Sequence, residues 1–154
     1  MKTLFDFIAE SNAIEGIPAP PTEAEALAHD LFLALGKVVI EDLQRFVKAV
    51  APGARVRDTQ GMDVRVGGHI PPRGGFGVML ALQEILTRAN GWKRGARVPS
   101  WSPWAVHRDY ETLHPFMDGN GRSGRALWLW MHDGVAPLGF LHTFYYETLR
   151  EGKR

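Results

Sequence analysis

Apolar residues recur at helical spacing along most of this 154-residue chain. They stand three and four positions apart, which places them on one face of an α-helix. The stretches with this pattern are 3–14, 22–50, 78–89, 102–113, 123–131 and 141–149. The pattern predicts a mainly α protein whose helices pack through their apolar faces.

Two of the helix starts carry capping residues. Thr22 precedes Glu25 by three positions, which is the spacing of a capping box. Ser102 is followed by Pro103, a proline suited to the first position of a helix. The pattern leaves open whether residues 22–50 form one long helix or two helices broken near Gly36.

Turn-forming residues mark several helix ends. Asn90-Gly91 is expected to end the helix of residues 78–89, and Asp133-Gly134 that of residues 123–131. Pro115 disfavours helical backbone at the residue before it. His114 is therefore expected to end a helix in an extended conformation.

Residues 55–73 differ in character from the helical stretches. Apolar and polar positions alternate around Gln60-Gly61, with Val56, Met62, Val64 and Val66 as the apolar ones. This alternation predicts one small β-hairpin. The following Gly-Gly-His-Ile-Pro-Pro run, residues 67–72, is incompatible with a helix.

Composition narrows the class of protein. The length suits one domain, and a net charge of +1 argues against a nucleic-acid partner. The absence of cysteine excludes disulfides, zinc–thiolate sites and thiol nucleophiles. Residues 1–10 do not form a signal peptide, and no apolar run is long enough to span a bilayer. We therefore expect a cytoplasmic protein with neither a nucleic acid nor a membrane as partner.

The densest chemistry lies in residues 114–125. His114 is suited to take a proton near neutral pH, and Asp118 is an oxygen ligand suited to Mg²⁺ beside phosphates. Gly119 and Gly121 let the backbone approach a ligand closely, and successive N–H groups there bind anions. These features together indicate a site for a triphosphate.

The helix expected after this turn adds to the phosphate site. Its first N–H groups point at the turn and carry partial positive charge. Arg122 and Arg125 stand three apart, so they lie near one another and can both fork onto phosphate oxygens.

Residues 114–125 match the H-x-F-x-(D/E)-G-N-G-R-x-x-R signature, and the chain therefore resembles the Fic (Fido) family, which moves AMP from ATP onto a protein hydroxyl. The resemblance covers nearly the whole chain. It implies a compact Fic-type helical bundle with one small β-hairpin flap. It also implies a single Fic domain, 1–154, with an inhibitory helix segment at 1–17, the flap at 55–73 and a catalytic helix–loop–helix at 102–134.

The resemblance implies a role for each position of the signature. His114 would deprotonate the target hydroxyl, Asp118 would hold Mg²⁺ against the α- and β-phosphates, and Phe116 would anchor the core. The remaining nucleotide-binding positions are Gly119, Asn120 and Gly121 as an anion hole, Arg122 and Arg125 on the β- and γ-phosphates, and Ser123 and Gly124 between the arginines.

Two further segments resemble parts of the family's site. Val66, Gly67, Gly68 and His69 match the flap, whose strand edge binds an extended segment of the target protein beside the nucleotide. Tyr145 and Tyr146 match a pair that stacks on adenine, although the asparagine that often follows in the family is absent here.

The N-terminal segment resembles the family's inhibitory motif, (S/T)-x-x-x-E-(G/N). The matching residues are Ser11, Glu15 and Gly16. In the family, a helix lays this glutamate over the nucleotide site. Glu15 would then pair with Arg125 and keep the γ-phosphate of ATP from its place.

The expected function is therefore AMP transfer from ATP to a Ser, Thr or Tyr hydroxyl of a target protein, restrained by Glu15. Three alternatives stay open from the sequence. In the first, Glu15 orients a water that removes AMP from a target. In the second, the donor is another nucleotide or a phosphocholine carrier, or phosphate itself is transferred. In the third, the chain is a nucleotide-binding regulator or toxin with little turnover. Self-association is also compatible with the sequence.

Overall fold

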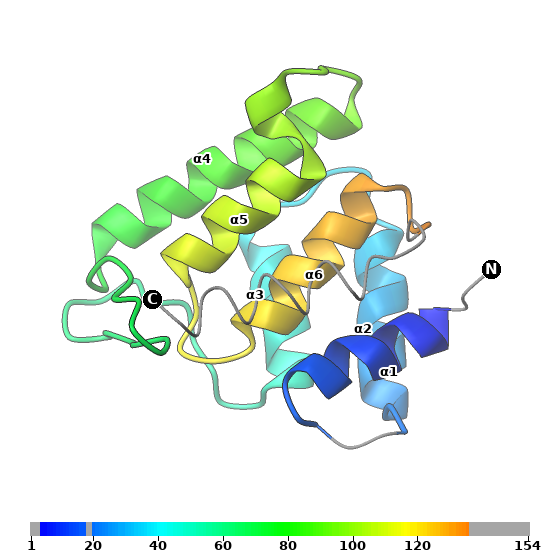
Figure 1. Cartoon of the computed structure of the whole chain (residues 1–154), viewed down its shortest axis with the longest axis horizontal. Helices are drawn as coiled ribbons and strands as arrows, with labels where there is room; N and C mark the ends of the chain where they lie inside the picture. Colours follow the sequence, from blue (N-terminus) through cyan, green and yellow to red (C-terminus); the bar gives the residue numbers. More distant parts are fainter. Residues whose placement is uncertain (1–3, 18–19, 136–154) are drawn as a thin grey trace.

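The structure is a computed structural model that describes residues 4–17 and 20–135. In these residues the chain forms six α-helices and one short 3₁₀-helix (Figure 1). Their bounds are α1 Leu4–Ile14, α2 Glu23–Leu33, α3 Ile40–Val50, α4 Phe76–Lys93, η1 Pro99–Trp101, α5 Pro103–Leu113 and α6 Asn120–Met131. The mainly α class is confirmed. Among these helices, none has the length and apolar character needed to cross a membrane.

Helix α6 is the centre of the bundle and contacts each of the other α-helices (Figure 1). Eleven of its twelve residues are buried, Gly121 being the exception. A helix that is covered on all sides is a core helix rather than an amphipathic surface helix. Because the signature residues form its first turns, the candidate site is built on the most completely buried of the described helices.

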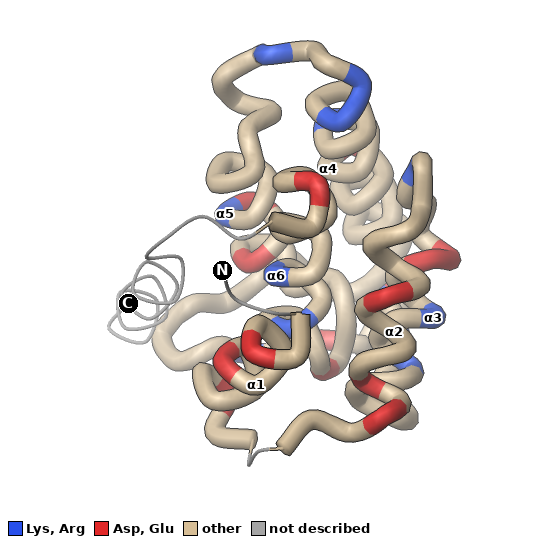
Figure 2. The backbone as a smooth tube through the Cα atoms, turned by 90° about the vertical axis from the view of Figure 1, so that its right-hand side faces the viewer, with Lys and Arg blue, Asp and Glu red and all other residues tan. Residues whose placement is uncertain are grey.

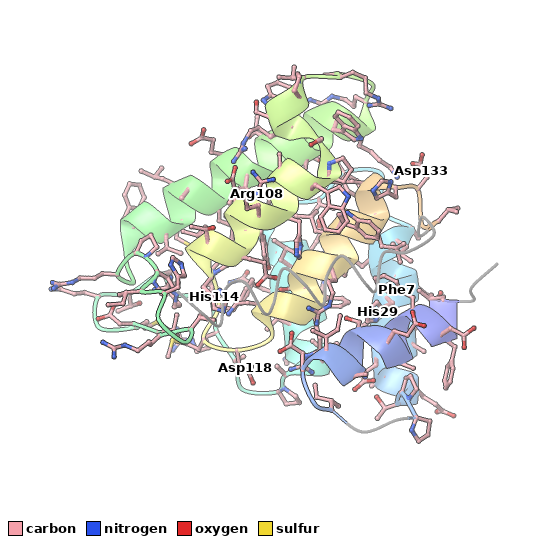
Figure 3. The ribbon with its side chains drawn as sticks, in the orientation of Figure 1. Phe7, His29, Arg108, His114, Asp118 and Asp133 are labelled. Atoms are coloured by element: carbon pink, nitrogen blue, oxygen red, sulfur yellow. The ribbon has the colours of Figure 1, made fainter. Side chains whose placement is uncertain are left out.

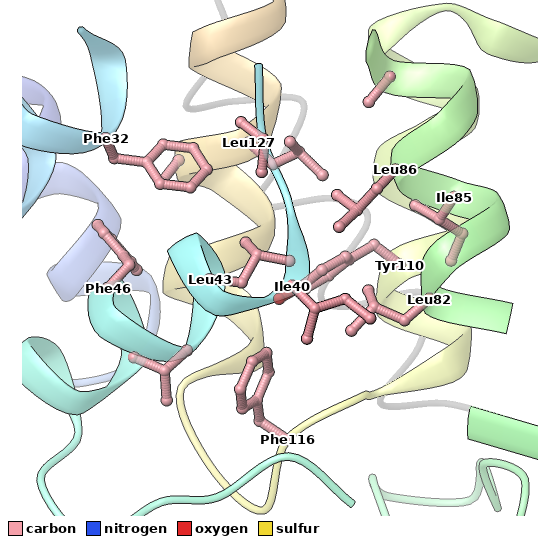
Figure 4. Close-up of a cluster of buried hydrophobic side chains, with 14 of the residues drawn as sticks. Phe32, Ile40, Leu43, Phe46, Leu82, Ile85, Leu86, Tyr110, Phe116 and Leu127 are labelled. Atoms are coloured by element: carbon pink, nitrogen blue, oxygen red, sulfur yellow. The ribbon is translucent and has the colours of Figure 1, made fainter. Parts of the chain in front are cut away.

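The main core lies between α6 and helices α2 to α5 (Figure 4). Phe116, which precedes α6, is fully buried in this core beside Ile40 and Leu43, as expected for an anchor. A smaller cluster joins Phe7 of α1 to Trp128 and Leu129 of α6. The N-terminal helix is therefore docked on the same element that begins at the site.

The stretch 22–50 forms two helices. Thr22 accepts from the Glu25 N–H and Glu25 accepts from the Thr22 N–H, so the predicted capping box is present. The break falls around Gly36, as the second of the two readings expects. In the connection, the Asn90 amide pairs with both the N–H (2.9 Å) and the C=O (2.8 Å) of Val38.

The expected end of the fourth helix is wrong, because α4 continues through Asn90-Gly91 to Lys93. Asn90 serves the connection at Val38 and also donates to the Leu86 carbonyl. Gly91 lies against the ring of Trp101, where a Cβ would stand 2.6 Å from a ring carbon. Both residues are therefore explained by packing rather than by helix termination.

The starts of α5 and α6 fall on either side of the signature. The Ser102 cap with Pro103 at the first position of α5 is confirmed. Helix α6 begins at Asn120, three residues before the expected 123, because Gly119 at φ 79° turns the chain directly into the helix.

The small β-hairpin is not observed. The described residues 55–73 form no strand, so the alternation of apolar and polar positions around Gln60-Gly61 does not correspond to a hairpin. A tight turn instead stands at Gly67-Gly68, closed by two hydrogen bonds between Val66 and His69 (3.0 and 2.9 Å). The segment is held by an isolated bridge from Val56 to Phe116 and by the buried Arg57, which replace a strand ladder.

Candidate active site

A cavity of about 340 Å³ lies at the start of α6. It is bordered by the end of α1, by residues 64–66 and by the loop of residues 114–119, called here the motif loop. Figure 3 labels His114 and Asp118 of this loop. We call this cavity the α6 cavity. Its lining residues are Glu15, Val64, Arg65, Val66, His114, Met117, Asp118, Gly119, Asn120, Gly121 and Arg122. The structure thus brings together residues from three separate parts of the sequence.

His114 ends α5 and borders the cavity (Figure 3). Its Nδ1 lies 2.6 Å from the Glu111 carbonyl oxygen, which can only accept, so Nδ1 carries the proton and Nε2 has the lone pair. Burial lowers the pKa of His114, and the charges of Arg57 and His69 act in the same direction. The imidazole is therefore a neutral base at pH 7.

The backbone of His114 differs from the expectation. It is left-handed, with φ 51° and ψ 65°, rather than extended. Proline after it disfavours only the right-handed helical region strongly, and a left-handed residue ends the helix equally well. A non-glycine residue in this region is strained and persists where its surroundings hold it.

Asp118 is exposed beside the cavity. Its Oδ1 accepts from the Gly119 N–H at 2.8 Å, which orients the carboxylate. The described residues contain no cluster of three or more His, Cys, Asp or Glu side chains suited to a metal. A single carboxylate fits Mg²⁺, which keeps waters and binds substrate phosphates as its other ligands.

The part of the site suited to an anion is the N-terminus of α6. Gly119 supplies the left-handed turn, and the N–H groups that follow lack helical partners. The Asn120 side chain does not extend into this site; it pairs with both the N–H and the C=O of Phe116, each at 2.8 Å. Asn120 therefore braces the motif loop, and only its backbone is placed to bind an anion.

The two arginines of the signature have different surroundings. Arg122 borders the cavity and donates to the Val50 carbonyl at 2.5 Å, while its buried Nε has no hydrogen-bond partner in the described part of the chain. Arg125 is 3% exposed and stands behind Glu15 rather than in the lining.

Ser123 and Gly124 are buried outside the lining of the α6 cavity. The Ser123 hydroxyl bonds to Tyr110 (2.7 Å) and to the Gly119 carbonyl (2.8 Å). A Cβ on Gly124 would stand 2.7 Å from Glu111 Oε1, so a small residue lets α5 approach α6 closely. Their nucleotide-binding role stays a prediction.

Arg125 joins α6 to the end of α1. Its Nη2 donates to Glu15 Oε1 at 2.8 Å and to the Ser11 carbonyl at 3.0 Å, and its Nε donates to the Ser11 hydroxyl at 2.7 Å. Figure 2 shows α1 lying beside α6. The Glu15 carboxylate also covers Gly121, where a Cβ would stand 2.0 Å from Oε1. Gly16, at φ 71°, ends the segment.

The flap residues lie beside this arrangement. Val66 borders the cavity, and Gly67 has a φ of 56°, which suits glycine. The His69 ring is turned toward α5, where Nε2 donates to the Thr112 carbonyl at 2.9 Å. His69 therefore fastens the flap to α5. Tyr145 and Tyr146 lie outside the described residues.

Sequence reasoning missed Arg57, Arg65 and Met117. Arg65 and Met117 are cavity-lining neighbours of predicted positions, so proximity to Val66 and Asp118 was their only signal. Arg57 is fully buried, yet it occupies a polar position in an alternating pattern, which suggests an exposed side chain. No sequence signal marked it.

The sequence matches the Fic/DOC family profile over residues 26–132. It is 34% identical over 141 residues to a protein of Culex quinquefasciatus named Protein adenylyltransferase Fic, covering 85% of this chain and 26% of that protein.

Two further relatives carry the same name. The protein of Drosophila mojavensis is 34% identical over 140 residues, covering 85% of this chain and 26% of its own length. That of Drosophila grimshawi is 36% identical over 110 residues, covering 66% of this chain and 21% of its own length. The chain thus spans about a quarter of the length of the curated relatives it matches.

Proposed function

Because the chain belongs to the Fic/DOC family, we propose that it is a nucleotidyltransferase that moves AMP from ATP onto a Ser, Thr or Tyr hydroxyl of a target protein. One observation carries the proposal: the neutral His114, with its Nε2 lone pair, borders the same cavity as the anion-binding start of α6. A base and a phosphate site in one cavity are the two requirements of such a transfer.

In the proposed reaction the target hydroxyl attacks the α-phosphorus of ATP. The bond between that oxygen and the α-phosphorus forms as the bond from the α-phosphorus to the bridging oxygen breaks, and pyrophosphate leaves with that oxygen. The hydroxyl proton passes to His114 Nε2. The hydrogen bond from Nδ1 to Glu111 (2.6 Å) holds the ring in the tautomer that this step needs.

The phosphates would be held by the start of α6 and its arginines. Helix N–H groups, the orphaned Arg122 Nε and a released Arg125 supply donors around the cavity. Asp118 would hold a Mg²⁺ ion, which neutralises phosphate charge when bound. ATP and Mg²⁺ are thus the proposed substrate and cofactor.

We further propose that Glu15 restrains this activity. Its carboxylate occupies Arg125 and lies over Gly121 at the start of the anion site. A γ-phosphate that approaches this position meets a like charge, and it finds the arginine already paired. Displacing Glu15 is therefore required before ATP can bind productively.

The flap supports the proposed protein substrate. Residues 64–66 border the same cavity as His114, and the proposal is that an extended target segment pairs with their main chain by strand addition. The protein target, the cytoplasmic location of this chain and its self-association stay predictions.

A second candidate reaction is removal of AMP from a modified target. Glu15 and His114 border the same cavity, so the carboxylate and the base face one substrate site. In that reaction Glu15 would orient a water toward the phosphorus. Protein modified by Glu15→Gly would then lose AMP on incubation with the wild type but not with Glu15→Gly.

The donor and transferred group are tested by intact-mass spectrometry. Glu15→Gly is incubated with ATP and Mg²⁺, since self-modification needs no identified target. The proposal expects a mass gain of one AMP less water, absent in Glu15→Gly/His114→Ala. A gain of one phosphate alone, or a gain that persists without His114, would contradict the proposal. Modification by UTP or another donor, but not by ATP, would show that ATP is not the donor.

A further inference from the structure

Arg57 is the most deeply buried of the arginines described. It is fully buried, and every hydrogen bond from its guanidinium goes to a main-chain carbonyl. The negative charge that acts on it is Asp63, which is itself bonded to the Gly74 N–H. A buried arginine used in this way organises backbone rather than forming an ion pair.

Two of these bonds cap the C-terminal end of α5 at His114, the proposed catalytic base. Arg57 Nε donates to the His114 carbonyl at 2.6 Å, and Nη2 donates to the Leu113 carbonyl at 2.7 Å. The Arg57 main-chain N–H donates to the Pro115 carbonyl at 2.8 Å. One residue therefore binds three consecutive carbonyls around His114.

The other bonds reach the flap segment. Arg57 Nη1 donates to the Pro72 carbonyl at 2.7 Å and to the Met62 carbonyl at 3.2 Å. These two acceptors stand on either side of the turn at Gly67-Gly68. The same guanidinium thus holds the base of the flap and the end of α5.

The final carbonyls of α5 are all used in this arrangement. A helix leaves its last four carbonyls without helical partners. Here Glu111 accepts from His114 Nδ1, Thr112 from His69, and Leu113 and His114 from Arg57. Two of the donors come from the flap segment, so the strained backbone of His114 is fixed from the flap side.

We infer that Arg57 is the positioning residue for His114: it fixes the left-handed backbone that aims the imidazole into the α6 cavity and joins that backbone to the flap. The inference rests on the proposed function. Arg57 does not line the α6 cavity and acts through His114. Lysine cannot replace it, because one ammonium group cannot reach Leu113, His114 and Pro72 with fixed geometry.

The kinetic test compares Arg57→Lys and Arg57→Gln, both in the Glu15→Gly background. We expect kcat for self-modification to fall about 100-fold, the scale of a misplaced catalytic group, with KM for ATP changed less than about threefold. Guanidinium ion added to Arg57→Ala should recover part of kcat, because it restores donors at the two carbonyls of α5.

Asn90→Ala in the same background is the matched control. Asn90 is also buried and also joins two main-chain segments, but it lies away from the α6 cavity. If Arg57→Lys loses no more kcat than Asn90→Ala, at similar loss of thermal stability, Arg57 is a structural residue and the inference is wrong.

A second measurement needs no turnover and separates the two proposals. In proton NMR of the whole chain, the His114 Nδ1–H should exchange slowly because it is bonded to Glu111. We expect Arg57→Lys and Arg57→Gln to lose that signal and Asn90→Ala to keep it. If Glu15→Gly transfers no AMP, the proposed function fails, and this signal still decides the role of Arg57. An unchanged signal in both Arg57 variants overturns the inference.

Discussion

Arg125 is the residue at which the proposed substrate binding and the proposed restraint meet. It donates to both Ser11 and Glu15 of α1, and the same guanidinium is the candidate partner of the γ-phosphate. The Glu15 side chain is 40% exposed whereas that of Arg125 is 3% exposed. A carboxylate at the surface is easier to displace than a buried arginine, so α1 is the side of the contact that can open.

Glu15→Gly should bind ATP more tightly than the wild type. A hydrogen bond to a charged partner contributes about 1.5–3 kcal/mol, and about 1.4 kcal/mol corresponds to tenfold in affinity. We therefore expect a gain of about tenfold or more for ATP and little gain for AMP, which has no γ-phosphate. Calorimetry measures both affinities, and a His114→Ala background prevents turnover during the measurement. Equal gains for ATP and AMP would contradict the competition.

The pH dependence of transfer should reflect His114. Its pKa is lowered from 6.5, and the neutral form is the active base, so protonation inhibits only below that value. The Glu15→Gly substitution removes an anion that raises this pKa, so protonation inhibits at a still lower pH. We expect kcat/KM to stay level from pH 7.5 to about 6.5 and to fall in more acid solution. An acid limb centred above 6.5 would contradict the assignment.

At the scale of elements, the junction between α5 and α6 determines the site. Helix α5 delivers His114 at its left-handed end, and α6 begins six residues later at Asn120. The motif loop between them is braced by Asn120 at Phe116 and by the bridge from Val56. The C-terminus of one helix and the N-terminus of the next are thus both fixed at the border of the cavity.

Asn90→Ala should destabilise the fold and spare the site. It removes two buried hydrogen bonds between α4 and the connection before α3, and a third within α4 to the Leu86 carbonyl. Leaving such groups unsatisfied costs about 1–3 kcal/mol. Urea unfolding should show this loss, while kcat in the Glu15→Gly background stays within about twofold. A loss of kcat as large as that of Arg57→Lys would mean that α4 controls the site.

The elements that could be predicted are those with local signals. The capping box at Thr22, the Ser102 cap and the helical patterns depend on neighbours within four positions. Residues whose partners lie far along the chain were missed or misread. Asn90 looked like a helix end because its partner Val38 is 52 positions away, and the acceptor carbonyls of Arg57 at 113 and 114 are 56 and 57 positions away.

At the scale of the whole molecule, several histidines are buried in forms that resist protonation. Burial lowers the pKa of His29 and of His114, and it lowers that of His107 to about 3. Below pH 6.5 the unfolded chain binds protons that the folded chain does not. The free energy of unfolding must therefore decrease as the pH falls.

The contribution of His107 gives a defined window. Between pH 6.5 and about 3 it should remove up to about 1.4 kcal/mol of unfolding free energy per pH unit. Urea unfolding of the wild type and His107→Gln at pH 7, 6 and 5 measures this. The unfolding free energy of the variant should decline less steeply with falling pH than that of the wild type. Equal slopes would mean that His107 is not the source of the decline.

The site as a whole was predictable in its residues more than in its geometry. The pairing of Glu15 with Arg125 follows from a resemblance in two short motifs, 110 positions apart, and the contact is present at 2.8 Å. The flap was expected as a strand pair, but its shape depends on the buried Arg57 and on His69 bonded to α5. Side-chain bonds to backbone leave no periodic pattern in a sequence.

The central claim is AMP transfer from the α6 cavity, restrained by the Glu15–Arg125 contact. The most direct measurement is the initial rate of self-labelling from [α-³²P]ATP with Mg²⁺ by the wild type, Glu15→Gly and Glu15→Gly/His114→Ala. The account predicts a rate at least about tenfold above wild type in Glu15→Gly, the effect of one released charged contact, and loss of that rate with His114. Equal rates in the wild type and Glu15→Gly, or labelling that survives without His114, would contradict it.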